Sequence, residues 1–196
     1  MEPFKVDILK SRNRRSTLVP FCLAIEDRPQ YVEFDLISAF DIEPEGKKHA
    51  MQGIVPEPTE TSSILQCLPV QTLLLAAGNP TVHWFILDIE GVELQVLQTI
   101  PWHSVDIEII SVETDLAGLI MPGSRQEIID YLQSKGYIHR WDLTSHLSLM
   151  GLHCRSHQVE SRIKSGVVKD DLFIREDVFQ RYRNINTNSL ILRDEL

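Results

Sequence analysis

The stretch from residue 82 to residue 100 constrains the fold more than any other part of the chain. A hydrophobic run ends at Asp88, and two further carboxylates, Glu90 and Glu93, follow with Gly91 between them. The apolar residues then switch to helical spacing at Ile89, Val92, Val96 and Ile100. A buried strand that ends in an acid and leads directly into a helix is typical of the ligand-binding edge of an open α/β sheet. The pattern predicts a strand over 82–88 and a helix over 89–99, with Glu90 and Glu93 on one helix face.

A purely structural interpretation of the same acids stays open. Carboxylates in the first turn of a helix stabilise its positive end, and an Asp directly before a helix is a common N-cap. Asp88 is therefore either a site residue or an N-cap. Glu90 and Glu93 bind a ligand, brace the loop, or charge an ordinary first turn.

Composition excludes several classes of protein. The net charge of −9 over 196 residues argues against a nucleic-acid binder, and no stretch approaches the eighteen apolar residues that a membrane span needs. Two of the three cysteines, Cys22 and Cys67, lie in apolar strand-like runs, which favours buried free thiols. No cysteine or histidine spacing predicts a metal site. The N-terminus has no signal-peptide core, whereas the last four residues, RDEL, resemble an endoplasmic-reticulum retrieval signal.

Strand and helix patterns alternate along the chain. Strands are predicted over 17–25, 31–37, 64–68, 82–88, 105–112, 137–143 and 172–175, and helices over 70–77, 89–99 and 124–135. Residues 43–63 are rich in Pro, Glu, Gly and Lys, which predicts a surface loop. The order indicates an α/β fold with a mostly parallel sheet and an antiparallel edge strand. We expect one domain over 1–178 and a tail over 179–196.

Four segments carry a resemblance to a known family: LDIEGVELQVLQTIPW (87–102), VDIEIISVET (105–114), GSRQEIIDYLQSKGY (123–137) and DDLFIRED (170–177). Together they resemble the FkbM-type methyltransferase domain, a branch of the class I S-adenosylmethionine (SAM) methyltransferases with a Rossmann-like sheet. The combination is most similar to the arthropod Star-like proteins, which are associated with the trafficking of growth-factor precursors.

The resemblance implies roles for five acids. It places Asp88, Glu90, Glu93 and Glu113 on the catalytic side, with Asp88 also beside the cofactor, and it matches Glu2 to the acid that holds the ribose. An enzyme of this family would methylate a hydroxyl of a small molecule. A Star-like protein would instead act on a secretory cargo protein in the endoplasmic reticulum or Golgi, and without that route the chain would be cytoplasmic.

One family feature is missing from the sequence. The family binds SAM with a glycine-rich turn after strand one, where the backbone must approach the ligand closely. The nine glycines here include no G-x-G, and Glu2-Pro3 matches the end of the family's second strand. The sequence thus predicts a domain without strand one and its glycine-rich loop, either as a truncated sequence or as a short protein that has abandoned the cofactor. We expect it to bind SAM poorly and to act in trafficking rather than catalysis, with SAM-dependent O-methylation as the alternative.

Overall fold

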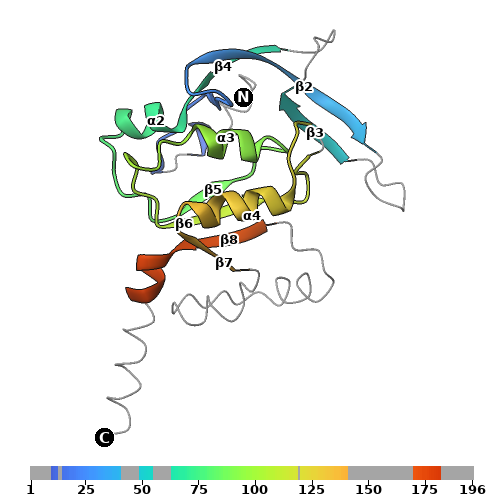
Figure 1. The fold of residues 1–196 in the computed structure, drawn as a ribbon. Helices are drawn as coiled ribbons and strands as arrows, with labels where there is room; N and C mark the ends of the chain where they lie inside the picture. Colours follow the sequence, from blue (N-terminus) through green and yellow to red (C-terminus); the bar gives the residue numbers. More distant parts are fainter. Residues whose placement is uncertain are drawn as a thin grey trace, which may run out of the picture. The chain divides into compact units, whose positions relative to one another are not determined.

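A computed structural model describes residues 10–12, 15–40, 49–54, 63–118, 120–140 and 170–181 (Figure 1). The chain forms two compact units. The first comprises residues 1–79 and 94–105, and the second comprises residues 80–93 and 106–196. Each unit contains its own four-stranded sheet, so the protein is a mixed α/β fold.

The sheet of the first unit has the strand order β1-β4-β2-β3. Its strands are β1 (Cys22–Leu23), β2 (Gln30–Phe40), β3 (His49–Ile54) and β4 (Ser63–Leu68). β1 pairs with β4 in parallel, and the other two pairings are antiparallel. The strand predicted over 17–25 is reduced to two residues, because Pro20 lacks the N–H group that a ladder requires.

The predicted surface loop over 43–63 contains a strand that the sequence analysis missed. β3 pairs with β2 from Phe34↔Ile54 to Phe40↔His49, and the register shifts once near Ser38. The segment HAMQGI has no clear period-2 alternation, so local pattern gave no strand signal. The segment forms a strand because its backbone pairs with β2.

A disulfide between Cys22 and Cys67 joins β1 to β4, so the prediction of free thiols was wrong. The two cysteines are direct partners in the parallel register, and their Cα atoms lie 4.3 Å apart. Cys67 also belongs to a small buried core with Ala24 and Val32. Two cysteines in separate strands give no sign in the sequence that the strands are neighbours.

Two helices belong wholly or largely to the first unit. α2 (Val70–Ala76) follows Pro69 and ends before Gly78 and Asn79, which both have positive φ, as the sequence predicted. α3 (Glu93–Thr99) begins four residues later than predicted, because Glu90 and Gly91 have φ of +63° and +103° and cannot continue a right-handed helix. Among the described residues, no helix is both long and apolar enough to cross a membrane.

The sheet of the second unit has the order β5-β6-β8-β7. Its strands are β5 (Phe85–Leu87), β6 (Ile109–Glu113), β7 (Tyr137–Arg140) and β8 (Asp170–Arg175). β5 and β6 are parallel, and β8 is antiparallel to both β6 and β7. Only one of the three pairings is therefore parallel, so the prediction of a mostly parallel sheet was wrong, and the antiparallel strand lies inside the sheet rather than at its edge. The sequence could not show this, because residues 141–169 separate β7 from β8 and local pattern does not record the order of strands.

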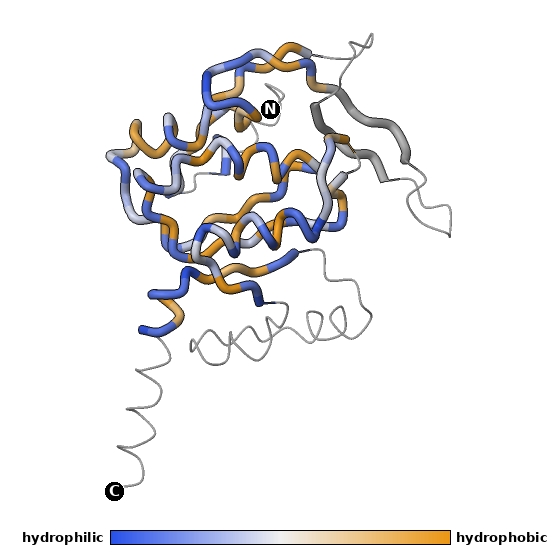
Figure 2. Tube along the Cα trace, viewed as in Figure 1, coloured by the Kyte–Doolittle hydropathy of each residue, from blue (hydrophilic) through white to orange (hydrophobic). Residues whose placement is uncertain are grey.

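Helix α4 (Arg125–Ser134) packs against this sheet through one face. Its buried residues are Ile128, Ile129 and Leu132, and Figure 2 shows hydrophobic and hydrophilic positions interspersed along it. The Ser124 hydroxyl accepts a hydrogen bond from the Glu127 N–H at 3.2 Å, so the predicted N-terminal cap is confirmed. The buried residues of this sheet include Leu87, Ile110 and Phe173, each 0–1% exposed.

β5 is less buried than its hydrophobic sequence predicted. Ile86 is 64% exposed and Trp84 is 47% exposed, while Leu87 is 1% exposed. Within the described ranges β5 is an edge strand that pairs only with β6. An edge position leaves its outer side uncovered, which explains the exposed apolar residues.

Candidate functional site

Three acids converge where β5 and β6 end. Asp88 follows β5 directly, and Glu113 is the last residue of β6. Because Leu87 pairs with Val112 in a parallel register, the next residue of each strand lies beside the other. Glu90 joins them from the turn after β5, and one carboxylate oxygen from each residue lies within 4.8 Å of the other two. We call Asp88, Glu90 and Glu113 the acid cluster.

The turn between β5 and α3 sets the direction of Glu90. Its φ of +63° is uncommon for a residue with a side chain and costs about 1 kcal/mol or more. Such strain persists only where neighbouring contacts hold it in place. The prediction that Glu90 and Glu93 share a helix face was therefore wrong, because Glu90 precedes the helix in a left-handed conformation.

Glu93 holds this turn together. It is 1% exposed, and its carboxylate accepts hydrogen bonds from the backbone N–H of Ile89 at 3.0 Å and of Gly91 at 3.0 and 3.1 Å. Burial raises the pKa of Glu93, although these backbone hydrogen bonds act in the opposite direction. Glu93 is separate from the acid cluster, and its contacts are those of a residue that positions Glu90.

Glu113 is the electrostatic centre of the cluster. It is 6% exposed, and burial together with the charges of Asp88, Asp115 and Glu90 raises its pKa to about 8. A hydrogen bond with Asp88 acts in the same direction. The raised pKa favours the protonated form of Glu113, while Asp88 beside it is exposed. A proton donor next to a carboxylate is an arrangement suited to binding a hydroxyl group or moving its proton.

A second buried acid, Asp171, which no sequence pattern singled out as a site residue, braces β6 and β8. Asp171 is 2% exposed and accepts hydrogen bonds from Arg125 at 2.6 and 2.7 Å, from Thr114 at 2.7 Å and from His139 Nε2 at 2.8 Å. Burial acts to raise the pKa of Asp171, but these hydrogen bonds together outweigh it and lower the pKa. A charged residue beside the apolar run Leu172–Ile174 was the signal that could have identified it. Thr114 follows Glu113, so this contact anchors the chain directly after the acid cluster.

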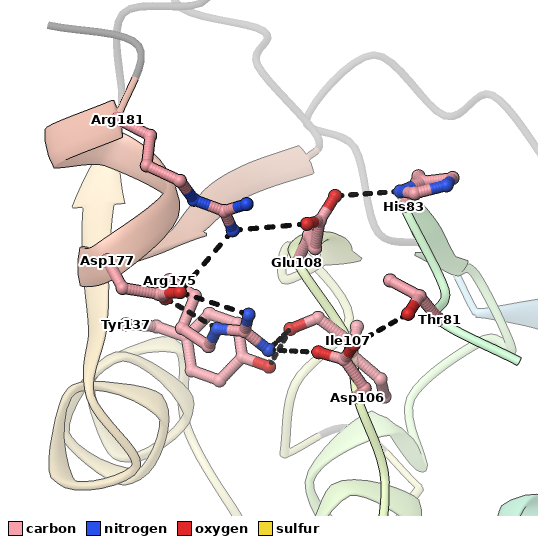
Figure 3. Close-up of polar contacts among 9 residues, drawn as sticks. All are labelled: Thr81, His83, Asp106, Ile107, Glu108, Tyr137, Arg175, Asp177 and Arg181. Carbon is pink, nitrogen blue, oxygen red and sulfur yellow. Dashed lines mark hydrogen bonds and ion pairs between the residues drawn. The ribbon is translucent and has the colours of Figure 1, made fainter. Parts of the chain in front are cut away.

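The opposite end of β6 carries a separate polar network (Figure 3). Arg175 pairs with Asp106 and with Asp177, and its guanidinium and the Tyr137 hydroxyl both donate to the Ile107 carbonyl. The network also includes Thr81, His83, Glu108 and Arg181. The hydrogen bond from Arg175 lowers the pKa of both Asp106 and Asp177. These contacts join the segment directly before β6 to Arg175 at the end of β8 and to Asp177 and Arg181 after it.

This fold and this site define a mixed α/β protein with acids at the carboxyl ends of two parallel strands, which is consistent with a methyltransferase-like fold. A family model for the methyltransferase FkbM domain matches residues 1–138, which is more than half of the 196 residues. The chain belongs to the FkbM methyltransferase family. The matched range includes the whole acid cluster and Glu93. No curated protein and no solved structure gives a significant match.

Enzymes of this family generally use SAM and act on small molecules. The residues present fit only part of a SAM site. The acid cluster is formed, but the 196 residues contain no G-x-G turn, and β5 has an exposed outer edge among the residues described. Glu2, the predicted ribose acceptor, lies outside the described residues. Among the residues that the structure describes, the acidic side of such a site is therefore the part that can be located.

Proposed function

We propose that this chain is a Star-like FkbM protein that binds its partner through the acid cluster and does not itself transfer a methyl group. The observation that carries the proposal is the contrast between the two sides of the site. Asp88, Glu90 and Glu113 meet within 4.8 Å, whereas the glycine-rich turn that would hold the methyl donor is missing from the sequence. A group with hydroxyls, on a small molecule or on a cargo protein, suits such acids because carboxylates accept its hydrogen bonds.

Isothermal titration of the full chain with SAM tests this proposal. We expect no saturable binding at concentrations up to about 1 mM, a level that corresponds to roughly −4 kcal/mol. Glu176→Gln, an exposed change outside the cluster, serves as the matched control for folding and concentration. Micromolar binding by the wild type that Asp88→Asn weakens would overturn the proposal and support the enzyme.

O-methyl transfer remains a second candidate, and one observation favours it. The pKa of Glu113, raised to about 8, lets the pair of Glu113 and Asp88 hold and release a proton near neutral pH. In this alternative Asp88 accepts the proton of a substrate hydroxyl while Glu113 remains protonated beside it. The titration above separates the candidates, because a methyltransferase must bind its donor.

We also propose that the chain acts in an oxidising compartment, the endoplasmic reticulum or Golgi. The disulfide between Cys22 and Cys67 supports this, since structural disulfides are rare in the cytosol and common in the secretory pathway. The RDEL sequence agrees with the same compartment and remains a prediction. The redox state of the Cys22–Cys67 pair in cells tests the assignment.

A further inference from the structure

Negative charge accumulates around Glu113 in the acid cluster. Asp88, Glu90 and Glu113 all belong to the second unit, and their oxygens lie within 4.8 Å of one another. The charges that act most strongly on Glu113 are all negative, and they belong to Asp88, Asp115 and Glu90. Carboxylates this close repel one another unless a proton or a cation lies between them.

A second observation points to a ligand. Glu113 is 6% exposed, and its Oε2 atom is buried without a hydrogen-bond partner among the residues that the structure describes. A buried polar atom without a partner costs about 1–3 kcal/mol, and native proteins avoid this cost almost everywhere. The other Glu113 contacts place its carboxyl group within the cluster, toward Asp88. Glu113 therefore brings to the cluster a buried carboxyl group with one oxygen that no described group satisfies.

We propose that Asp88, Glu90 and Glu113 form a binding site for one hard divalent cation of the Mg²⁺, Mn²⁺ or Ca²⁺ class. Three carboxylates without sulfur or imidazole are the ligand set that these cations prefer and that Zn²⁺ does not. Oxygens on opposite sides of a Ca²⁺ ion lie about 4.8 Å apart, and about 4.2 Å apart on Mg²⁺. The exposed Asp88 side chain is free to make the small closure that Mg²⁺ or Mn²⁺ needs.

The structure also indicates what such a cation would do. Asp88 is exposed and Glu113 is buried, so the cation would have protein on one side and solvent on the other. The remaining coordination positions would be open to water or to hydroxyls of a ligand, which a bound cation orients and polarises. The sequence predicted no metal site, because these ligands come from two strand ends that are more than twenty residues apart.

Direct cation binding tests the proposal without cofactor or substrate, so its outcome is independent of the proposed function. The full chain is freed of metal and titrated calorimetrically at pH 7 with Mg²⁺, Mn²⁺ and Ca²⁺ in turn. We expect saturable binding of one cation per chain to at least one of them, with a Kd of about 1 mM or tighter, as for open carboxylate sites. The same cation raises the melting temperature, because it binds only the folded state.

Three variants locate the site. Asp88→Asn and Glu113→Gln keep the size of each side chain and remove one charged ligand, so each is expected to weaken binding about tenfold or more. Asp130→Asn lies on the exposed face of α4, where Asp130 accepts a hydrogen bond from the Gln126 side-chain amide at 2.8 Å, and should bind like the wild type. Circular dichroism confirms that each variant is folded. If none of the cations binds saturably up to about 10 mM, or if Asp88→Asn binds as well as Asp130→Asn, the proposal is wrong and the cluster shares a proton instead.

Discussion

Gly91 makes the acid cluster possible. Its φ of +103° belongs to a region that side chains rarely adopt, and a Cβ atom there would lie 3.1 Å from the Leu116 carbonyl oxygen. The residue before it, Glu90, already carries strain in its backbone. The turn that brings Glu90 to Asp88 and Glu113 therefore requires glycine at this position.

Gly91→Ala is expected to lower the free energy of unfolding by about 2 kcal/mol, from backbone strain and the close contact together. Gly136→Ala is the matched control, because Gly136 also has positive φ (+86°) but no atom within 4 Å of an added Cβ. The control should lose about 1 kcal/mol from strain alone. Urea denaturation of both variants measures the difference, and equal losses would show that the Leu116 contact is unimportant.

β8 and its buried Asp171 connect three elements around the acid cluster. Asp171 bonds to Arg125 of α4, to His139 of β7 and to Thr114 directly after β6. Arg125 is 54% exposed, so water can replace its contact, whereas Thr114 is buried and His139 is 15% exposed. The cost of losing Asp171 therefore comes mainly from the buried partners that are left without an acceptor.

Asp171→Ala is expected to lower the free energy of unfolding by roughly 2–4 kcal/mol. Glu176→Ala lies just after the same strand, on an exposed side chain, and should change stability by less than about 0.5 kcal/mol. Chemical denaturation of the two variants against the wild type is the measurement. A loss below about 1 kcal/mol for Asp171→Ala would contradict a bracing role.

The elements that sequence pattern predicted well are those whose signals are local. α2 follows Pro69 and α4 follows the Ser124 cap, and both begin at the predicted positions. Asp88 and Glu113 were identified because each stands at the end of an apolar run. β3, the disulfide and the interior position of β8 were missed, because each depends on a partner that lies far away in the sequence. The left-handed turn at Glu90 was missed as well, because such a turn has no reliable sequence signature at a residue other than glycine.

The disulfide makes the folding stability of the chain depend on the redox state of its compartment. It closes a loop of 45 residues between two paired strands, and a cross-link of this span stabilises the folded chain by restricting the unfolded one. The bond persists only where thiols are oxidised, so it stabilises the folded chain only in an oxidising compartment.

Reduction of this bond is expected to cost about 2–4 kcal/mol of folding stability. Thermal unfolding with and without a reducing agent measures it, and Cys154→Ser should keep the full response while Cys22→Ser should lose it. In cells, alkylation at lysis should leave Cys22 and Cys67 unlabelled. Labelling of both cysteines in freshly lysed cells would place the chain in a reducing compartment and contradict the secretory assignment.

The order of strands in the second sheet has a consequence for how the chain is made. β8 lies between β6 and β7, yet a ribosome produces it after both of them. Until residues 170–175 emerge, β6 has no neighbour on one side, and its backbone groups there stay open to wrong partners. The strand that carries Glu113 thus completes its pairing late in synthesis, and a nascent chain released earlier would need protection by a chaperone.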